Sequence, residues 1–278
     1  MTPDRRLPLS AVLITRNAAS QLDECLASVA FCDDVVVVDS GSEDATCAIA
    51  ERHGARVIQS EWRGFGLQKQ FAVEQASHDW VLCIDADERV SEALRESICA
   101  VTCPDLVCRE FRFAGRQSGI PGTQSEPAPT LSAWRFARSN RFMGRYLKHG
   151  EGYPDWSLRL FDRRAARWSD DPVHEKVLAS GEVGTLQGDL LHESAESLEG
   201  YLAKQNRYST LAADEALARG ERATVLHLLL SPVLRFIKFY FFRMGVLDGL
   251  PGLVHILVGC SASFAKYAKM LAFQRSHQ

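Results

Sequence analysis

The chain of 278 residues lacks the compositional marks of several large protein classes. Only 10 residues are proline and 19 are glycine, while 46% are hydrophobic, which excludes a collagen-like or largely disordered chain. The net charge of −3 offers no general positive field, so we expect no nucleic-acid partner. The N-terminal apolar run is too short for the core of an export signal. These absences favour a globular protein of the cytoplasm.

Several sequence motifs are missing as well. The eight cysteines show no paired Cys-x-x-Cys spacing, so we expect reduced thiols in the core rather than a zinc or redox site. No Gly-x-x-x-x-Gly-Lys-Ser/Thr motif occurs, and no Gly-x-Gly-x-x-Gly motif follows the first predicted strand. P-loop hydrolysis and a dinucleotide-binding Rossmann site are therefore disfavoured.

Short apolar runs alternate with amphipathic segments from residue 9 to about residue 102. The runs 35–38 (VVVV) and 81–84 (VLCI) are apolar on both faces, which is typical of parallel strands covered by helices on both sides. Right-handed crossovers place the carboxyl ends of such strands along one edge, where ligands bind. We predict an α/β domain over residues 1–196, with a mostly parallel sheet and helices on both faces.

Residues 197–278 show helical periodicity and are predicted to form a helical extension. Residues 200–278 carry 10 Lys and Arg against 4 Asp and Glu, whereas the rest of the chain is acidic. This basic excess indicates that the extension faces an anionic partner, for which a membrane surface is the first candidate. The alternatives are a solvated helical cap and packing of the apolar residues on the α/β body.

The apolar stretches of the extension bear on how it would meet a membrane. The uncharged stretches 223–234 and 249–265 are shorter than the roughly 20 residues that span a bilayer, and proline or glycine interrupts each. A span is therefore not expected. In a helix over 225–242, four polar residues share one narrow stripe and apolar residues cover the rest, which is typical of a helix lying in the membrane interface. The polar residues are His227, Ser231, Arg235 and Lys238.

A segment rich in proline and glycine follows the α/β repeat, over residues 115–133. It has no apolar periodicity, which predicts a mobile loop. An active-site lid and a neutral insertion are both open interpretations.

Two carboxylates, Asp85 and Asp87, come directly after the apolar strand 81–84. At the carboxyl end of a buried strand they repel each other and are poorly hydrated unless a cation joins them. A hard divalent ion that bridges them to a diphosphate would resolve this conflict. The alternative is a solvated turn, in which Asp87 and Glu88 favour the start of the next helix.

Polar residues also follow two other predicted strands. Asp39 ends the strand 35–38, and Thr15, Arg16 and Asn17 end the first strand. An aspartate at a strand end can accept hydrogen bonds from a nucleobase or a ribose hydroxyl. Three strand ends that meet at one edge predict a nucleotide site.

Four segments in this order resemble family 2 glycosyltransferases with the GT-A fold: TRNAASQLDECLASV, VVVVDSGSEDAT, GFGLQKQFAVEQA and DWVLCIDADERV. Four later ones are similar to a bacterial subgroup, the lipopolysaccharide-core β-1,4-glucosyltransferases: RSNRFMGRYLKHGEGYPDWSLRLFDRR, DDPVHEKV, GDLLHES and YLAKQNRYSTLAADE. The resemblance covers nearly the whole chain. It implies transfer of glucose from UDP-glucose to an inner-core heptose, at the cytoplasmic face of the bacterial inner membrane.

The resemblance also implies roles for individual residues. It implies that a nucleotide-sugar site is formed by Thr15, Asn17, Asp39, Lys69 and Asp85. Asp85 and Asp87 would ligate Mg²⁺ or Mn²⁺, which stabilises the departing UDP. His192 is a candidate third ligand, with a purely structural histidine as the alternative.

An inverting transfer needs a base that takes the proton of the acceptor hydroxyl. In the segment 170–177 (DDPVHEKV), proline predicts extended backbone, and alternation sends His174 and Glu175 to opposite faces. The family pattern points to the same motif, so Glu175 is the expected base. Asp171 and Asp170 are the runners-up, and a solvated acidic turn is the alternative.

Basic and aromatic residues are dense over 141–159. Arginine forks match phosphate groups and aromatic rings stack on sugar faces, so this density predicts a surface for a phosphorylated, lipid-linked glycan. The expected acceptor residues are Arg141, His149, Trp156 and Arg159. For each residue singly, the alternative is a solvated charge or a buried aromatic ring. Other readings are transfer to another glycan or to a polyprenyl phosphate, nucleotidyl transfer, and a sugar-nucleotide-binding protein without turnover.

Overall fold

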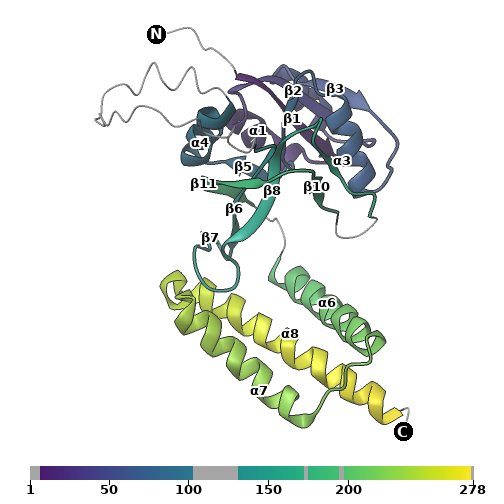
Figure 1. Ribbon diagram of the computed structural model, residues 1–278, viewed down its shortest axis with the longest axis vertical. Coiled ribbons are helices and arrows are strands. Elements are labelled where there is room, and N and C mark those ends of the chain that lie inside the picture. Colours follow the sequence, from purple (N-terminus) through teal and green to yellow (C-terminus); the bar gives the residue numbers. More distant parts are fainter. Residues whose placement is uncertain (1–6, 103–130, 172–174, 194–196, 277–278) are drawn as a thin grey trace, which may run out of the picture. The chain divides into compact units, whose positions relative to one another are not determined.

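The computed structural model describes residues 7–102, 131–171, 175–193 and 197–276 (Figure 1). The Pro/Gly-rich segment expected to form a loop lies mostly outside these residues. The chain divides into two compact units. The α/β unit comprises residues 1–138 and 156–192, and the helical unit comprises 139–155 and 193–278. The segment 139–155, which lies before the predicted domain boundary at 196, therefore packs with the C-terminal helices.

The α/β unit starts with the predicted alternation of strands and helices. Its first elements are β1 (Leu7–Thr15), α1 (Ala19–Ser28), β2 (Cys32–Asp39), α2 (Thr46–Arg52), β3 (Arg56–Gln59), α3 (Phe65–Glu74), β4 (Trp80–Cys83), β5 (Glu88–Val90) and α4 (Glu92–Thr102). The later strands are β6 (Ala133–Phe142), β7 (Arg145–Tyr146), β8 (Asp155–Asp162), β9 (Ala166–Trp168), β10 (Val177–Ala179) and β11 (Val183–His192). Strand β7 and the end of β6 belong to the helical unit.

One large sheet has the strand order β3-β2-β1-β4-β8-β6-β11-β5. Strands β3, β2, β1 and β4 are parallel, so their carboxyl ends share one edge as expected. The half that begins at β8 adds antiparallel pairs, with β4 against β8 and β11 against β5. These antiparallel pairs carry residues of the second half of the chain back beside the carboxyl end of β4.

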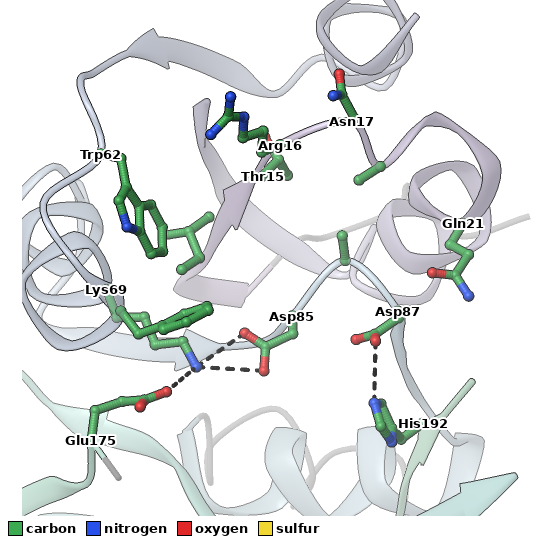
Figure 2. Close-up of a pocket in the computed structure, with 14 residues that line it drawn as sticks. Thr15, Arg16, Asn17, Gln21, Trp62, Lys69, Asp85, Asp87, Glu175 and His192 are labelled. Atoms are coloured by element: carbon green, nitrogen blue, oxygen red, sulfur yellow. Dashed lines mark hydrogen bonds and ion pairs between the residues drawn. The ribbon is translucent and has the colours of Figure 1, made fainter. Parts of the chain in front are cut away.

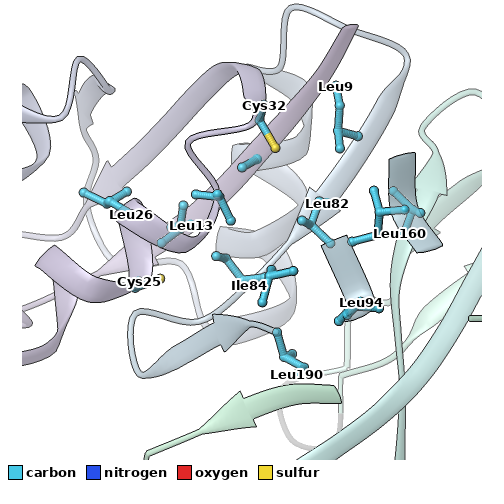
Figure 3. Packing of buried hydrophobic residues seen from close by; sticks show 14 of the residues in the cluster. Leu9, Leu13, Cys25, Leu26, Cys32, Leu82, Ile84, Leu94, Leu160 and Leu190 are labelled. Atoms are coloured by element: carbon cyan, nitrogen blue, oxygen red, sulfur yellow. The ribbon is translucent and has the colours of Figure 1, made fainter. Parts of the chain in front are cut away.

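Side-chain alternation along the strands explains why the sheet is covered on both faces. Leu13 of β1 and Leu82 of β4 pack with α1, α2 and α4 on one face (Figure 3). Val12 and Val81, one position earlier on each strand, pack with α3 and with Trp168 of β9 on the other face. Burial of both strand faces is what the double-apolar runs predicted. The six described cysteines are free, and four of them are buried.

The helical unit contains α6 (Leu198–Ala218), α7 (Val225–Phe236), a π-helical turn η1 (Ile237–Phe242), a 3₁₀ turn η2 (Gly245–Asp248) and α8 (Gly249–Ser276). Helix α8 packs along both α6 and α7 (Figure 1). Small residues of α6, Ala213 and Ala216, let it approach Met270 of α8 closely.

The expectation that proline and glycine interrupt both apolar stretches is wrong. Pro232 lies inside α7, which continues directly into η1. Pro251 lies in the first turn of α8, where the missing N–H costs no helical hydrogen bond. Two helical stretches, Val225–Phe242 and Gly245–Ser276, are therefore long and apolar enough to cross a membrane by length and composition.

Candidate active site

An open cavity of about 610 Å³ lies at the carboxyl edge of the parallel strands (Figure 2). The end of β1 contributes Thr15, Arg16 and Asn17, and the segment after β4 contributes Asp85 and Asp87. The remaining polar lining comes from Gln21, Lys69, Glu175 and His192. Most of the predicted nucleotide and metal residues therefore line one cavity, together with the predicted base.

Asp39 is placed differently from the other predicted nucleotide residues. Its fully buried carboxylate accepts hydrogen bonds from the Thr15 hydroxyl at 3.1 Å and from the backbone N–H groups of Gly41 and Ser42 at 3.0 and 2.8 Å. Burial opposes ionisation, but these bonds and that of the Ser42 hydroxyl hold the pKa of Asp39 below its usual value. Asp39 thus fixes the end of β1 and the turn after β2.

Asp85 lies between two cations. Lys69 Nζ is 3.2 Å from one carboxylate oxygen of Asp85, and Arg159 donates a 2.9 Å hydrogen bond to the other. Burial opposes ionisation of Asp85, yet the charges of Arg159 and Lys69 hold its pKa well below the ordinary value. The two cations therefore favour the ionised form of Asp85.

Lys69 of α3 connects Asp85 to Glu175. The lysine is 8% exposed, and its Nζ also lies 3.2 Å from Glu175 Oε1 (Figure 2). Its ammonium group stands 4.8 Å from the centroid of the Trp168 ring. One buried cation thereby holds two of the cavity's carboxylates, with an aromatic face beside it.

Arg159 and Glu88 form a layer beneath Asp85. Arg159, on β8, is only 7% exposed, so the prediction that it belongs to an exposed acceptor surface is wrong. Its guanidinium lies 3.4 Å from the fully buried Glu88, which accepts the backbone N–H of Asp85 at 2.9 Å. Burial raises the pKa of Glu88, against the opposing charge of Arg159.

The sequence pattern predicts no role for Glu88 beyond a helix start, and none for Trp168. The antiparallel pairing of β8 with β4 brings the arginine to these acids. The one sequence signal for a buried ion pair was the arginine inside the apolar run 158–161 (LRLF). An arginine on a strand that is covered on both faces needs buried partners.

Asp87 and His192 are paired in the lining of the cavity. His192 Nε2 is 3.2 Å from Asp87 Oδ2, and both side chains are partly exposed to the cavity (Figure 2). Within the described part of the chain, no group of three His, Cys, Asp or Glu residues is arranged to hold a metal ion. A carboxylate oxygen and an imidazole nitrogen suit a divalent cation, so the residues present offer two ligands of a site that a diphosphate would complete.

Glu175 is held at the cavity by a close approach of backbone to α3. A Cβ added at Gly66 would meet the Ser169 carbonyl oxygen at 2.3 Å and Glu175 Cβ at 3.4 Å. Only glycine at position 66 lets the segment beside Glu175 pack this closely on α3. Asp171 is exposed, and Asp170 is exposed and paired with Arg167 at 3.3 Å.

The predicted acceptor residues other than Arg159 have separate environments. Arg141 pairs with Glu193 at 2.8 Å, and His149 Nδ1 lies 3.2 Å from Asp248, both within the helical unit. Trp156 belongs to the α/β unit and is 47% exposed. The Arg135 guanidinium lies 5.0 Å from the centroid of the Trp156 ring.

The chain is similar to known sugar-transferring enzymes over most of its length. Residues 10–167 match the model of the family described as glycosyl transferase family 2. The lipopolysaccharide core biosynthesis glycosyltransferase LpsC of Rhizobium meliloti (strain 1021) is 33% identical, with 95% of this chain and 92% of that protein covered. An uncharacterized glycosyltransferase of Rickettsia bellii (strain RML369-C) is 29% identical, with coverages of 94% and 85%.

Among solved structures, the mannosyltransferase PcManGT of Pyrobaculum calidifontis, in complex with GDP-Man and Mn²⁺, aligns with 98% of this chain and 76% of its own. The sequence identity is 16% and the TM-score is 0.47.

The family match and the similarity to LpsC define the protein as a glycosyltransferase. The chain belongs to glycosyl transferase family 2. The predicted enzyme class and the predicted GT-A-like α/β fold class, with a helical extension, are both confirmed.

Proposed function

We propose that this glycosyltransferase moves glucose from UDP-glucose to a heptose of the lipopolysaccharide inner core, with inversion at the anomeric carbon and with the help of a divalent cation. One observation carries the proposal: Asp85, Asp87, His192 and Glu175 line a single cavity at the carboxyl edge of the sheet. The core-lipopolysaccharide acceptor is supported by the 33% identity with LpsC. The donor follows from the resemblance to core glucosyltransferases.

In this proposal, the nucleotide occupies the part of the cavity beside β1. Thr15 and Asn17 line that part, and Asn17 Oδ1 already accepts the backbone N–H of Glu43 at 2.8 Å, which braces the loop after β2. Asp39 contributes to uridine binding through the turn that it fixes, since its oxygens are used within the protein. Lys69 and Asp85 then lie beside the diphosphate and the ribose.

Asp87 and His192 would hold Mg²⁺ or Mn²⁺, with Asp85 close by. When bound, the cation neutralises charge that develops on the departing diphosphate. Asp85 is a weaker ligand candidate than Asp87, because Lys69 and Arg159 already neutralise its carboxylate.

Glu175 is the proposed general base. The acceptor oxygen bonds to the anomeric carbon, the bond from that carbon to the UDP oxygen breaks, and the proton of the acceptor hydroxyl passes to Glu175. Lys69 orients Glu175 through their 3.2 Å ion pair before the acceptor arrives. Asp171 remains the alternative base, although it is exposed to solvent.

The acceptor is proposed to be a lipid-linked glycan at the cytoplasmic face of the inner membrane. The exposed ring of Trp156 offers a stacking surface for a sugar, while Arg141 and His149 supply basic groups for phosphate. The basic C-terminal helices would keep the enzyme at the membrane surface as a peripheral protein.

The experiment that tests this function is mass spectrometry of core oligosaccharide from a strain that lacks the protein, paired with assays of the purified enzyme. A missing hexose on heptose, and UDP release from UDP-glucose with a heptose-terminated core acceptor, are expected. An unchanged core would contradict the acceptor, and activity with a polyprenyl phosphate would replace it. Release of pyrophosphate would indicate nucleotidyl transfer, and UDP binding without turnover would indicate a binding protein.

A further inference from the structure

Helix α7 turns polar groups toward the rest of the helical unit. In α7, Ser231 shares a 2.7 Å hydrogen bond with Ser263 of α8, and Arg235 pairs with Glu151 of the segment 139–155. Gly259 of α8 makes room for that ion pair, since a Cβ there would meet Glu151 Oε2 at 2.4 Å and Arg235 Nε at 3.1 Å. These polar groups of α7 are thus turned toward protein.

The apolar residues of α7 and η1 are turned outward. None of the 18 residues of Val225–Phe242, all of them described, is buried. The exposed fractions reach 64% for Leu226, 62% for Leu234 and 80% for Phe242. The others exposed there are Val225, Leu229, Leu230, Val233, Ile237 and Phe241. A continuous apolar face of this kind is rare on a monomeric soluble protein and marks a surface that another phase or partner covers.

Helix α8 extends the apolar surface. Leu250, Leu257 and Phe264 recur every seven residues, so they share one side of α8, and each is 46 to 64% exposed. The turn between the helices adds Met244 and Leu247, both about half exposed. We call the outward apolar residues of α7, η1, η2 and α8 the apolar face.

Charge identifies what covers this face. Residues 200–278 carry 10 Lys and Arg against 4 Asp and Glu. The exposed Arg222 precedes α7, the exposed Lys238 lies in η1, and the exposed Arg243 follows η1. An apolar surface with cations at its ends fits the boundary between acyl chains and anionic headgroups.

The charges of α6 distinguish two arrangements of α7 and α8, one that crosses the bilayer and one that lies in a single leaflet. Helix α6 packs along α8 and exposes Arg207, Asp214 and Glu215. If α7 and α8 crossed the hydrocarbon, α6 would carry these charges with it, at a cost of several kcal/mol each. A helix pair that lies in one leaflet, with α6 on the water side of α8, avoids this cost.

We propose that the apolar face of α7 and α8 is embedded in one leaflet of an anionic bilayer, parallel to its plane, and holds the enzyme as a monotopic membrane protein. Ser231 and Arg235 of α7 then serve helix packing rather than contact with water. This deepens the membrane-facing part of the proposed function, because the enzyme is then held by insertion into one leaflet as well as by charge. It is independent of the donor, the metal and the base.

The test is flotation of the full chain with vesicles of phosphatidylcholine and phosphatidylglycerol, without donor or acceptor. The double variant Leu229→Glu/Leu234→Glu is compared with the control Leu202→Glu/Leu211→Glu, whose leucines are 45% and 46% exposed on α6. We expect the α7 variant to partition at least about tenfold more weakly and the α6 variant to bind like the wild type. UDP binding reports that both variants remain folded.

Salt dependence and oligomeric state distinguish a face embedded in the bilayer from one that is bound only by charge or covered by a second copy of the chain. Binding that persists in 1 M salt is expected for an embedded face, because only the electrostatic part is screened. Complete release by salt, or equal loss of binding in both variants, would overturn the embedding. A dimer in the absence of vesicles that the α7 variant converts to monomer would assign the face to a second copy of the chain instead. A chain that fails to float would contradict the embedding. The proposed reaction is tested separately, by the UDP-glucose assay.

Discussion

Arg159 donates a 2.9 Å hydrogen bond to Asp85 from below the cavity floor, although 74 positions separate the two residues along the chain. The same guanidinium lies 3.4 Å from Glu88, which accepts the backbone N–H of Asp85. Asp85 is therefore held through its side chain and through its backbone. The acidic motif of this glycosyltransferase is set in place by an arginine that the sequence pattern placed on the surface.

Replacing Arg159 by methionine is expected to raise the pKa of Asp85, because the cation that most favours its ionised form is removed. As the pH is lowered, the variant should therefore lose UDP affinity at a higher pH than the wild type does. Arg159→Lys should restore part of the wild-type pH profile of UDP binding. The control Arg163→Met removes an arginine at the end of the same strand that bonds the carbonyl of Ala76 instead. Matching pH profiles of UDP binding for Arg159→Met and the wild type would show that Arg159 does not position Asp85.

Glu175→Gln is expected to lower kcat by about 10² to 10⁴-fold, since an amide cannot take the acceptor proton. UDP-glucose affinity should change little, because the shape of the side chain is kept. Asp171→Asn and Asp170→Asn are the matched controls and should keep most of the activity. Steady-state kinetics with acceptor, together with calorimetric titration of UDP, measure both quantities. Full turnover by Glu175→Gln would show that another residue is the base.

Asp87→Ala and His192→Ala are expected to raise the Mn²⁺ concentration needed for half-maximal activity by about 10 to 100-fold each. Both side chains face the cavity, and each is the other's partner at 3.2 Å. The double variant should be little worse than the single ones, because two ligands of one ion act as a unit. Activity that withstands chelation by EDTA in the wild type would contradict a metal-dependent reaction.

Gly66→Ala is expected to displace the segment that carries Glu175, because the new Cβ would lie 2.3 Å from the Ser169 carbonyl oxygen. The free energy of unfolding should fall by about 1–3 kcal/mol, as in other overpacked sites. We expect kcat to fall more than the affinity for UDP. Leu67→Ala, at the next position of α3 but 46% exposed, is the control. If Gly66→Ala kept both wild-type kcat and wild-type stability, the close packing at this position would contribute neither to catalysis nor to stability.

The sequence predicted the carboxyl edge of the parallel sheet, because strand periodicity and right-handed crossovers fix where residues such as Thr15 and Asp85 lie. It did not predict the burial of Arg159, whose partners Asp85 and Glu88 approach only through the antiparallel pairing of β8 with β4. Local pattern also misjudged Pro232, because a helix with tertiary contacts tolerates the loss of one hydrogen bond.

Asp34 links the stability of the α/β unit to pH. Its buried carboxylate accepts hydrogen bonds from Arg56 at 2.9 and 3.2 Å, from the Ser77 N–H at 2.9 Å and from the Ser10 hydroxyl at 2.7 Å. Burial opposes ionisation, but these donors together lower the pKa of Asp34 to about 2. A carboxyl group with a depressed pKa stabilises the folded state above its unfolded value of roughly 4, and this contribution is lost as the pH falls toward 2.

Asp34→Asn should therefore lower the free energy of unfolding by about 1–2 kcal/mol at pH 7, and the difference from the wild type should narrow between pH 4 and pH 2. Urea unfolding at pH 7, 4 and 3 measures this difference. Asp33→Asn, which changes the more exposed neighbour paired with His78, is the control and should alter unfolding little at pH 7. A difference between Asp34→Asn and the wild type that stays constant down to pH 3 would mean that the lost packing of Asp34, and not its charge, carries the stability.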